Sequence, residues 1–494
     1  MAFQVQPPHF ILIPFMAQGH LLPVIDIARL LARRGVIITI FTTPVNAKRF
    51  ESIVAREVDA GLQIRVIKLD FPSAEAGLPD GCECFDMLPS IESGINFFAA
   101  ARMLRPSVEQ WLSELKPSPS CILSDMCHPW TSQVARKFQV PRLVFHGFCC
   151  FSLLCSHNLT NSEDLDNVTS DAEYFTVPDL PDHIELTKAQ VVGLVKPIIP
   201  EWAEIQEQIR ETEKEAYGVV VNTFEELELD YVRQYKKAKG KGVWCIGPVS
   251  LCNKENLDKA ERGNKASINE HQCMKWLDTW EPESVIYACL GSITRLATSQ
   301  LIELGLGLES SGRPFVWVTR DASDEFRKWL VEEKFEERTK GIGLLIHGWA
   351  PQVLILSHPS IGGFLTHCGW NSTIEGISSG APMITWPLFA EQFVNEKLVL
   401  YVLKTGVKAG VESPVYIGHE EDVGVQVTRD NTKTAIEALM DQGEEGQMRR
   451  KRAAELKKMA RKAADEGGSS HLNIEQLIKD IMEKVHTKSI TDDS

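Results

Sequence analysis

The chain has 494 residues, of which 44% are hydrophobic and 24% are charged, a globular balance with enough apolar material for two or three domains. A formal net charge of −15 argues against a non-specific nucleic-acid binder, because such proteins need a basic face. The first residues lack the basic region of a signal peptide, and no apolar run approaches the length of a membrane helix. We therefore expect a cytoplasmic protein without a transmembrane segment, whose twelve cysteines are reduced thiols.

Strand-like and helix-like patterns alternate through the first half of the chain. The apolar run 9–15 is typical of a buried strand, a helical period follows over 21–34, and the β-branched run 36–43 predicts a second strand. Because strands that alternate with helices indicate parallel βαβ units, we expect a sheet covered on both faces. Further strands are expected at 63–69, 120–124, 142–146 and 217–222.

The second half repeats this alternation after a polar stretch, 253–265, that has no apolar period and that we interpret as a surface linker. The chain then ends in two charged helical segments, 445–465 and 471–485. Between the polar stretch and these terminal segments, strands are expected at 284–290, 314–319, 343–347, 362–366 and 382–386, with helices at 298–310 and 372–379.

These patterns predict an α/β protein with two doubly wound, Rossmann-like domains facing a central cleft, at the carboxyl ends of the strands. We expect residues 1–250 to form the first domain and 251–270 to form the linker. Residues 271–465 would form the second domain. Residues 466–494 would form a helix and tail, and the helix could pack back on the first domain.

Two ionisable side chains follow strand ends in the first domain. His20 lies between the strand 9–15 and the helix expected from Leu21, where α/β folds place reactive groups, and the pKa of an imidazole suits proton abstraction near neutral pH. Asp125 ends another apolar strand expected in the same sheet, and it could orient the imidazole and stabilise its charged form. Taken singly, His20 could merely pack and Asp125 could cap a helix. Together they suggest a base and its acidic partner.

The strongest pattern lies in the second domain, within residues 349–392. Gly369 is expected to permit a tight turn from the strand 362–366 into the next helix. That turn would point backbone N–H groups and the helix dipole at a phosphate. Asn371 and Ser372 would add amide and hydroxyl donors beside it.

Three further side chains of this block complete the expected site. His367 could meet the same diphosphate, and Trp349 offers a flat face on which a base can stack. Glu375, one turn into the helix, could accept hydrogen bonds from ribose hydroxyls. The residues therefore predict a nucleotide diphosphate site, without naming a sugar.

The 44-residue stretch from Trp349 to Gln392 resembles, in length and order, the signature box of the plant secondary-product UDP-glycosyltransferases, a family 1 glycosyltransferase group. The box begins Trp-Ala-Pro-Gln, contains His-Cys-Gly-Trp-Asn-Ser and ends with an acid followed by Gln. The loop Phe15-Met-Ala-Gln-Gly-His20 resembles the catalytic histidine loop of that family, and Ser124-Asp125-Met126 resembles its aspartate strand. The resemblance covers essentially the whole chain.

This resemblance implies a GT-B fold and an inverting sugar transfer that uses no cofactor and no metal ion. The domain 1–250 would bind a small apolar hydroxylated acceptor, and the domain 271–465 would bind the UDP-sugar donor, which is the co-substrate. His20 would be the general base and Asp125 its partner, and the closing Gln392 favours UDP-glucose. The implied donor site comprises Trp349 and the Ala350 backbone for uracil, Gln352 and Glu375 for ribose, Ser292, His367, Asn371 and Ser372 for the phosphates, and Trp370, Glu391 and Gln392 for the sugar hydroxyls.

Several readings stay open. The segments 125–130 and 145–148 resemble a subgroup that glycosylates triterpenoids, steroids and flavonoids, and His128 could line the acceptor pocket or sit beside it. The stretch 376–380 matches the Gly-x-Ser-x-Gly elbow of hydrolases, but a helix is expected before it and a strand after it, the reverse of what the elbow needs. The main alternative is a sugar-nucleotide-binding protein without turnover, which would have no need of both His20 and Asp125.

Overall fold

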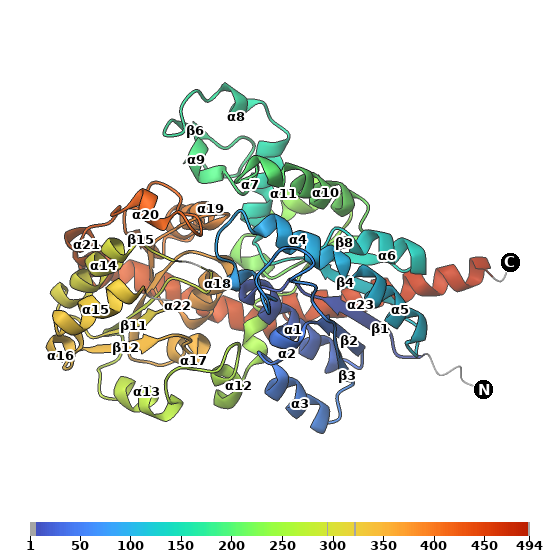
Figure 1. The fold of residues 1–494 in the computed structure, drawn as a ribbon, viewed down its shortest axis with the longest axis horizontal. Helices are drawn as coiled ribbons and strands as arrows, with labels where there is room; N and C mark the ends of the chain where they lie inside the picture. Colours follow the sequence, from blue (N-terminus) through green and yellow to red (C-terminus); the bar gives the residue numbers. More distant parts are fainter. Residues whose placement is uncertain (1–5, 294, 321–322, 493–494) are drawn as a thin grey trace.

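The computed structural model describes residues 6–293, 295–320 and 323–492. Two parallel sheets form two lobes that lie side by side (Figure 1). The first sheet has the strand order β3-β2-β1-β4-β5-β8-β9. Its strands are β1 (His9–Ile13), β2 (Ile37–Thr42), β3 (Ile64–Lys68), β4 (Cys121–Asp125), β5 (Arg142–His146), β8 (Gly218–Val221) and β9 (Gly242–Cys245).

The second sheet has the order β12-β11-β10-β13-β14-β15, which is the strand order of a dinucleotide-binding domain. Both sheets confirm the predicted pair of doubly wound α/β domains. The strands are β10 (Val285–Cys289), β11 (Phe315–Thr319), β12 (Gly343–His347), β13 (Ile361–Thr366), β14 (Met383–Thr385) and β15 (Gly406–Lys408); β6 (Tyr174–Thr176) and β7 (Glu185–Thr187) form a separate antiparallel pair.

Helices cover both faces of each sheet, and strands such as β1, β4 and β10 are therefore buried along their whole length. The helices of the first lobe and the connection are α1 (Gln18–Ala32), α2 (Pro44–Ala47), α3 (Glu51–Asp59), α4 (Gly94–Met103), α5 (Arg105–Glu114), α6 (Thr131–Phe138), α7 (Cys150–Thr160), α8 (Asp164–Asn167), α9 (Lys188–Val191), α10 (Ala203–Lys214), α11 (Leu229–Lys239) and α12 (Asn256–Ala260). Those that follow are α13 (Glu270–Leu277), α14 (Thr298–Ser310), α15 (Asp324–Glu332), α16 (Phe335–Thr339), α17 (Gln352–Leu356), α18 (Trp370–Ser379), α19 (Gln392–Lys397), α20 (Glu420–Val423), α21 (Arg429–Leu439), α22 (Glu444–Ala464) and α23 (Ser469–Asp492).

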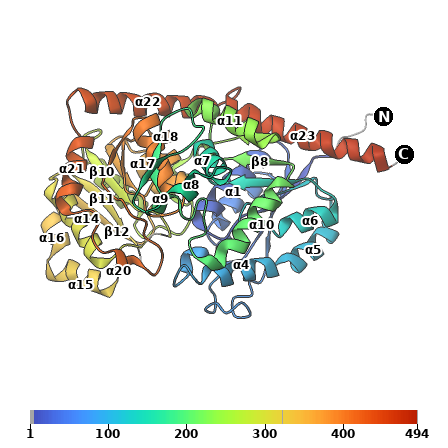
Figure 2. The same ribbon diagram turned by 90° about the horizontal axis from the view of Figure 1, so that it is seen from above.

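The last two helices run along one side of the molecule, from the second lobe to the first (Figure 2). Helix α22 packs against α18, and α23 packs against β9. Ile474, Leu477 and Ile481 of α23 are buried in the same apolar cluster as Trp244 of β9. The C-terminal helix therefore returns to the first sheet.

The polar stretch 253–265 differs from the surface linker that its composition predicts. It contains the short helix α12, and the side chains of Asn253 and Arg262 are buried. A buried charge is tolerated where it is paired, and here the partners come from helices that lie far away in the sequence. Composition alone does not distinguish such paired polar residues from solvated ones.

All twelve cysteines are unpaired thiols, and eleven of them are buried, as expected from the sequence. Within the part of the chain that the structure describes, no helix combines the length and the apolar character needed to cross a membrane.

Candidate active site

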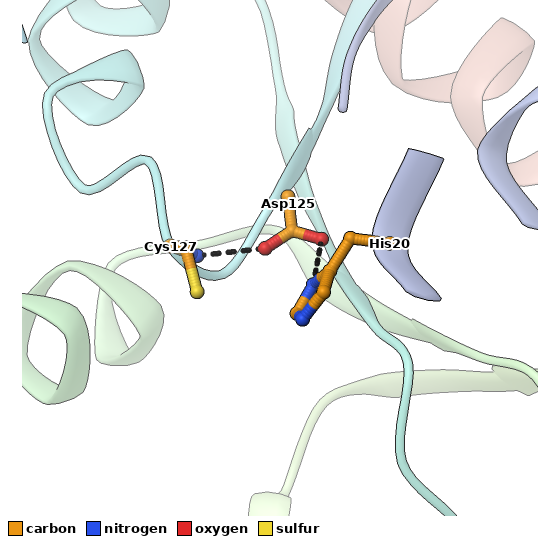
Figure 3. Close-up of side chains that lie close together, drawn as sticks. All are labelled: His20, Asp125 and Cys127. Atoms are coloured by element: carbon orange, nitrogen blue, oxygen red, sulfur yellow. Dashed lines mark hydrogen bonds and ion pairs between the residues drawn. The ribbon is translucent and has the colours of Figure 1, made fainter. Parts of the chain in front are cut away.

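The imidazole of His20 and the carboxylate of Asp125 meet at the carboxyl ends of two neighbouring strands. His20 lies in the first turn of α1, which begins at Gln18, earlier than the sequence predicts. Its Nδ1 lies 2.8 Å from Oδ2 of Asp125, the last residue of β4 (Figure 3). Because β1 and β4 are adjacent in the sheet, the chain reverses its winding direction here, and this is where α/β folds bind ligands.

Asp125 is fully buried and does not cap a helix. Its Oδ1 accepts a hydrogen bond of 2.9 Å from the backbone N–H of Cys127, so both of its oxygens are engaged. The His20 side chain is 21% exposed and faces the cleft described below. With Nδ1 held by Asp125, Nε2 is the ring nitrogen that can take a proton from a molecule in the cleft.

The electrostatics of this pair suit a base near neutral pH. Burial lowers the pKa of His20, but the charge and the hydrogen bond of Asp125, with a smaller contribution from the charge of Glu391, raise it above its ordinary value on balance. Burial raises the pKa of Asp125, but the charge and hydrogen bond of His20 lower it overall. Phe15 packs edge-on to the imidazole at 5.4 Å between ring centroids, which further restricts the ring.

His20, Asp125 and Cys127 place one nitrogen, oxygen or sulfur atom each within 4.8 Å of one another (Figure 3). These three side chains are one ligand short of the four that a structural zinc site usually has. Both oxygens of Asp125 already accept hydrogen bonds. The three side chains therefore fit an oriented imidazole better than a metal site.

A cleft of about 970 Å³ lies between the loops at the carboxyl ends of the two sheets. On the first lobe, one part of the wall is aromatic and apolar, with Phe15, Phe85, Ile91, Phe98 and Trp202. Another part is polar and charged, with His157, Glu207, Arg210, Lys214 and Lys241. Asp125 is not part of the wall, because it lies behind His20. The opposite wall contains every residue expected in the donor site: Ser292, Trp349, Ala350, Gln352, His367, Gly369, Trp370, Asn371, Ser372, Glu375, Glu391 and Gln392.

The turn between β13 and α18 differs in detail from the expectation. Gly369 has an ordinary φ of −58°, and the left-handed residue is Cys368, with a φ of 63°. Gly369 is needed for space instead, because a Cβ there would lie 2.4 Å from the ring of His367. Gly291, which has a φ of +88°, makes the same room on the loop after β10, where a Cβ would lie 2.5 Å from that ring.

The ring of His367 is thus packed between two glycines at the edge of the cleft. Burial lowers its pKa to about 4, so the imidazole is neutral at physiological pH. Its Nδ1 is buried without a hydrogen-bond partner. An unsatisfied buried nitrogen beside a helix N-terminus is the feature expected where an anionic ligand is to bind.

The first residues of α18 also contact the first lobe. The indole N–H of Trp370 donates to the carbonyl of Asn222 at 2.7 Å, and its ring is buried. The amide of Asn371 donates to the carbonyl of Gly19, next to His20, and its oxygen accepts from Asn222 at 3.3 Å. Neither contact is predictable from the sequence pattern.

The residues expected around ribose lie together. Gln352 donates from Nε2 to Oε2 of Glu375 at 2.8 Å and to the hydroxyl of Ser372 at 3.1 Å. The guanidinium of Arg320 lies over the ring of Trp349, with its central carbon 5.6 Å from the ring centroid. These side chains form one continuous surface next to the turn at His367.

The acidic end of the block is held by backbone contacts. Glu391 accepts from the backbone N–H of Trp370 at 3.2 Å, and burial raises its pKa. The Oε1 of Gln392 accepts from the backbone N–H groups of Leu388 at 2.8 Å and Phe389 at 3.3 Å. These bonds leave the amide nitrogen of Gln392 for a ligand in the cleft.

The structure also shows where His128 and the stretch 376–380 lie, and it adds Arg262, which the sequence did not indicate as a site residue. His128 is buried beside the cleft wall, where its ring contacts the carbonyl of Pro14 at 3.1 Å and Trp130 at 3.3 Å. The stretch 376–380 ends helix α18 and precedes β14, so it has no elbow geometry. Arg262 lies in the polar stretch 253–265, which the sequence predicts to be a linker, and it donates to Oε1 of Glu375 at 2.5 Å.

Comparisons with known proteins agree with this site. A glycosyltransferase N-terminal domain profile matches residues 9–251, and a UDP-glucoronosyl and UDP-glucosyl transferase profile matches residues 262–413. UDP-glycosyltransferase 73C11 of Barbarea vulgaris is 55% identical over 480 residues, 97% of each chain.

Two solved structures share the fold over almost their whole length. UGT73P12 of Glycyrrhiza uralensis, complexed with glycyrrhetinic acid 3-O-monoglucuronide, has a TM-score of 0.90 and 34% identity, covering 99% of this chain and 98% of that one. UGT2 of Phytolacca americana, complexed with UDP-2fluoro-glucose and pterostilbene, has a TM-score of 0.75 and 25% identity, covering 96% and 99%. The chain therefore belongs to the plant-type UDP-glycosyltransferases, has their GT-B fold, and is a glycosyltransferase.

Proposed function

We propose that this enzyme transfers glucose from UDP-glucose to a hydroxyl of a small apolar acceptor, with inversion at the anomeric carbon. The observation that carries the proposal is the His20–Asp125 pair, which faces an aromatic wall on its own lobe and the Glu391–Gln392 end of the donor wall across the same cleft. A base between an apolar surface and a nucleotide-type site suits proton removal from an apolar alcohol.

The reaction is a single displacement. Nε2 of His20 takes the proton of the acceptor hydroxyl while that oxygen forms a bond to the anomeric carbon. The bond from that carbon to the phosphate oxygen breaks on the opposite face, and its electron pair leaves with UDP. Asp125 stabilises the imidazolium, and the N-terminus of α18 with His367 meets the charge on UDP. An α-linked donor would thus give a β-glucoside.

The class of acceptor is proposed from the aromatic side chains of the cleft wall on the first lobe. Phe15, Phe85, Phe98 and Trp202 pack against one another with ring centroids 5.5–6.4 Å apart and form one aromatic surface beside His20. Such a surface favours triterpenoid, steroid or flavonoid skeletons over sugars or peptides. The glycyrrhetinic acid derivative bound by the Glycyrrhiza neighbour supports an apolar acceptor.

Glucose is proposed as the sugar because of the two residues that end the 349–392 block, Glu391 and Gln392. The amide of Gln392 and the carboxylate of Glu391 can together donate to and accept from sugar hydroxyls. The Phytolacca neighbour, whose structure contains a UDP-glucose analogue, supports this assignment. We further propose that the reaction needs no metal ion, since His367 and the helix N-terminus can stabilise the leaving group.

A mass-spectrometric screen tests the proposal. Purified enzyme is offered UDP-glucose, UDP-galactose or UDP-glucuronic acid with triterpenoids, steroids, flavonoids and plant hormones, with and without a chelator. We expect monoglucosides of apolar alcohols or phenols to form from UDP-glucose at the same rate in the presence of the chelator. Preferred use of another UDP-sugar, or loss of activity with the chelator, would contradict the donor or metal assignment.

A further inference from the structure

A buried guanidinium joins the two lobes at the donor wall of the cleft, which it helps to line. Arg262 has a side chain that is 7% exposed, and it donates from Nε to Oδ2 of Asp26 at 2.9 Å and from Nη1 to Oε1 of Glu375 at 2.5 Å. Asp26 lies in α1, the helix that carries His20 in its first turn, and Glu375 lies in α18. One side chain of the connecting segment therefore contacts both helices that border the cleft.

Asp26 is a fixed anchor for this guanidinium. Its Oδ1 accepts from the amide of Asn253 at 2.9 Å and from the thiol of Cys252 at 3.4 Å, while its Oδ2 is left for Arg262. The Asp26 side chain is 3% exposed. Because the contacts are buried and satisfy both oxygens, the position of the Arg262 side chain is well defined on the first lobe.

Glu375 is held from two sides. Arg262 contacts Oε1, and the amide of Gln352 contacts Oε2 at 2.8 Å. Each carboxylate oxygen can accept more than one hydrogen bond, so both retain capacity for a ribose hydroxyl. Without the guanidinium, a carboxylate that is only 5% exposed would lose its counter-charge, and it is expected to turn away.

The same segment also supports the neighbouring residue of the nucleoside site. The hydroxyl of Ser267 accepts from the backbone N–H of Trp349 at 2.9 Å, and the backbone N–H of Ser267 donates to the Trp349 carbonyl at 2.8 Å. Gly263, with a φ of +105°, lies against the Trp349 ring, where a Cβ would be 2.3 Å away. Residues 262–267 therefore support both the expected base platform and the expected ribose acceptor.

We propose that Arg262 is a positioning residue, which orients the Glu375 carboxylate toward the ribose of the nucleotide while Asp26 anchors it to α1. The inference rests on the donor site of the proposed function and adds a residue from outside the 349–392 block. Arginine suits the role because its planar fork can contact two carboxylates in fixed directions, whereas lysine presents a single ammonium group.

The test measures how strongly the enzyme recognises ribose hydroxyls. Calorimetric affinities for UDP, 2′-deoxy-UDP and 3′-deoxy-UDP are compared among wild type, Arg262→Gln, Arg262→Lys and Arg56→Gln. Arg56 is the matched control, because it pairs with Asp258 at 2.8 Å and with Glu261 in the same segment but does not reach Glu375. UDP carries no sugar, and the measurement includes no acceptor, so the result does not depend on which sugar or acceptor the enzyme uses.

We expect wild type to bind UDP about tenfold or more tightly than at least one deoxy analogue, the effect of a hydrogen bond to a charged group. Arg262→Gln should lower this ratio to below about twofold, Arg262→Lys should lose about half of it, and Arg56→Gln should keep it. In turnover, Arg262→Gln should raise the KM for the donor and leave the KM for the acceptor unchanged.

An unchanged ratio in Arg262→Gln would overturn the inference, as would an equal loss in Arg56→Gln. If Arg262→Gln does not fold, the test uses Arg262→Lys instead. A ratio of UDP affinity to deoxy-UDP affinity in Arg262→Lys equal to that of wild type would then overturn the inference. A wild type that discriminates between the nucleotides but transfers no glucose would contradict the proposed function and not this inference. A wild type that transfers glucose without such discrimination would contradict the role of Arg262 and leave the sugar transfer standing.

Discussion

At the scale of single residues, the proposed chemistry depends on how Asp125 holds His20. The carboxylate is fully buried, so water does not screen its charge, and it contacts Nδ1 at 2.8 Å. Glu391 adds a second negative charge from the opposite lobe. Together they place the pKa of the base above its ordinary value, and the buried His128 nearby stays neutral because burial lowers its pKa to about 4.

Asp125→Asn tests this account through the pH dependence of kcat/KM. A general base must be neutral to act, so the wild-type rate should fall as the pH drops through the raised pKa of His20. The substitution removes the charge that stabilises the imidazolium, so the pKa of His20 falls and the acid limb of the profile moves to lower pH. The plateau rate should also fall, because Asn does not stabilise the charged ring. An acid limb that stays in place would show that Asp125 does not tune His20.

At the scale of elements, apolar runs predicted most strands of the two main sheets, but they missed the edge strands β9 and β15 and the separate pair β6 and β7. The segments 142–146 and 343–347 were predicted with the bounds that β5 and β12 have, because continuous apolar runs are typical of buried parallel strands. The start of α1 was predicted too late, since the first turn of a helix carries polar residues such as Gln18 and His20, which give no apolar period. Strand ends then brought His20 and Asp125 together as expected.

The parts of the site that sequence reasoning missed depend on contacts between distant segments. Arg262 belongs to a polar stretch without period, and only the fold shows that Asp26 and Glu375 surround it. The prediction for Gly369 was likewise wrong in its reason. A side chain there would collide with the ring of His367, whereas its own backbone angles are ordinary. Spacing along the chain carries no information about either packing relation.

Helix α23 offers a test at the same scale. Leu477 is completely buried against the first sheet, so Leu477→Ala should lower the free energy of unfolding by about 2–5 kcal/mol through lost burial and the cavity left behind. Leu472, in the same helix but 51% exposed, is the matched control, and its replacement by Ala should change the free energy by less than about 0.5 kcal/mol. Denaturant titration of both variants measures this. Equal effects would mean that α23 does not stabilise the first lobe through its buried face.

At the scale of the whole molecule, the two lobes are connected around the cleft on several sides. Asn371 contacts the loop of His20, Arg262 joins α1 to α18, and the backbone N–H of Ile91 donates to the carbonyl of Ile417 at 3.0 Å. Helix α23 adds a fourth connection on the outer face (Figure 2). The proposed base on one lobe and the proposed phosphate site on the other are thereby held in one arrangement, as the proposed displacement between two bound substrates requires.

The central claim is that His20 removes the proton of the acceptor, and turnover of His20→Ala tests it most directly. The measurement uses saturating UDP-glucose and an aliphatic-alcohol acceptor from the screen, because a phenol ionises more readily and depends less on a base. The exposed His271, which lies outside the cleft, is replaced by Ala as a control. We predict that His20→Ala lowers kcat about a hundredfold or more and leaves the affinity for UDP unchanged, while His271→Ala is unaffected. A rate for His20→Ala close to that of wild type would contradict the account.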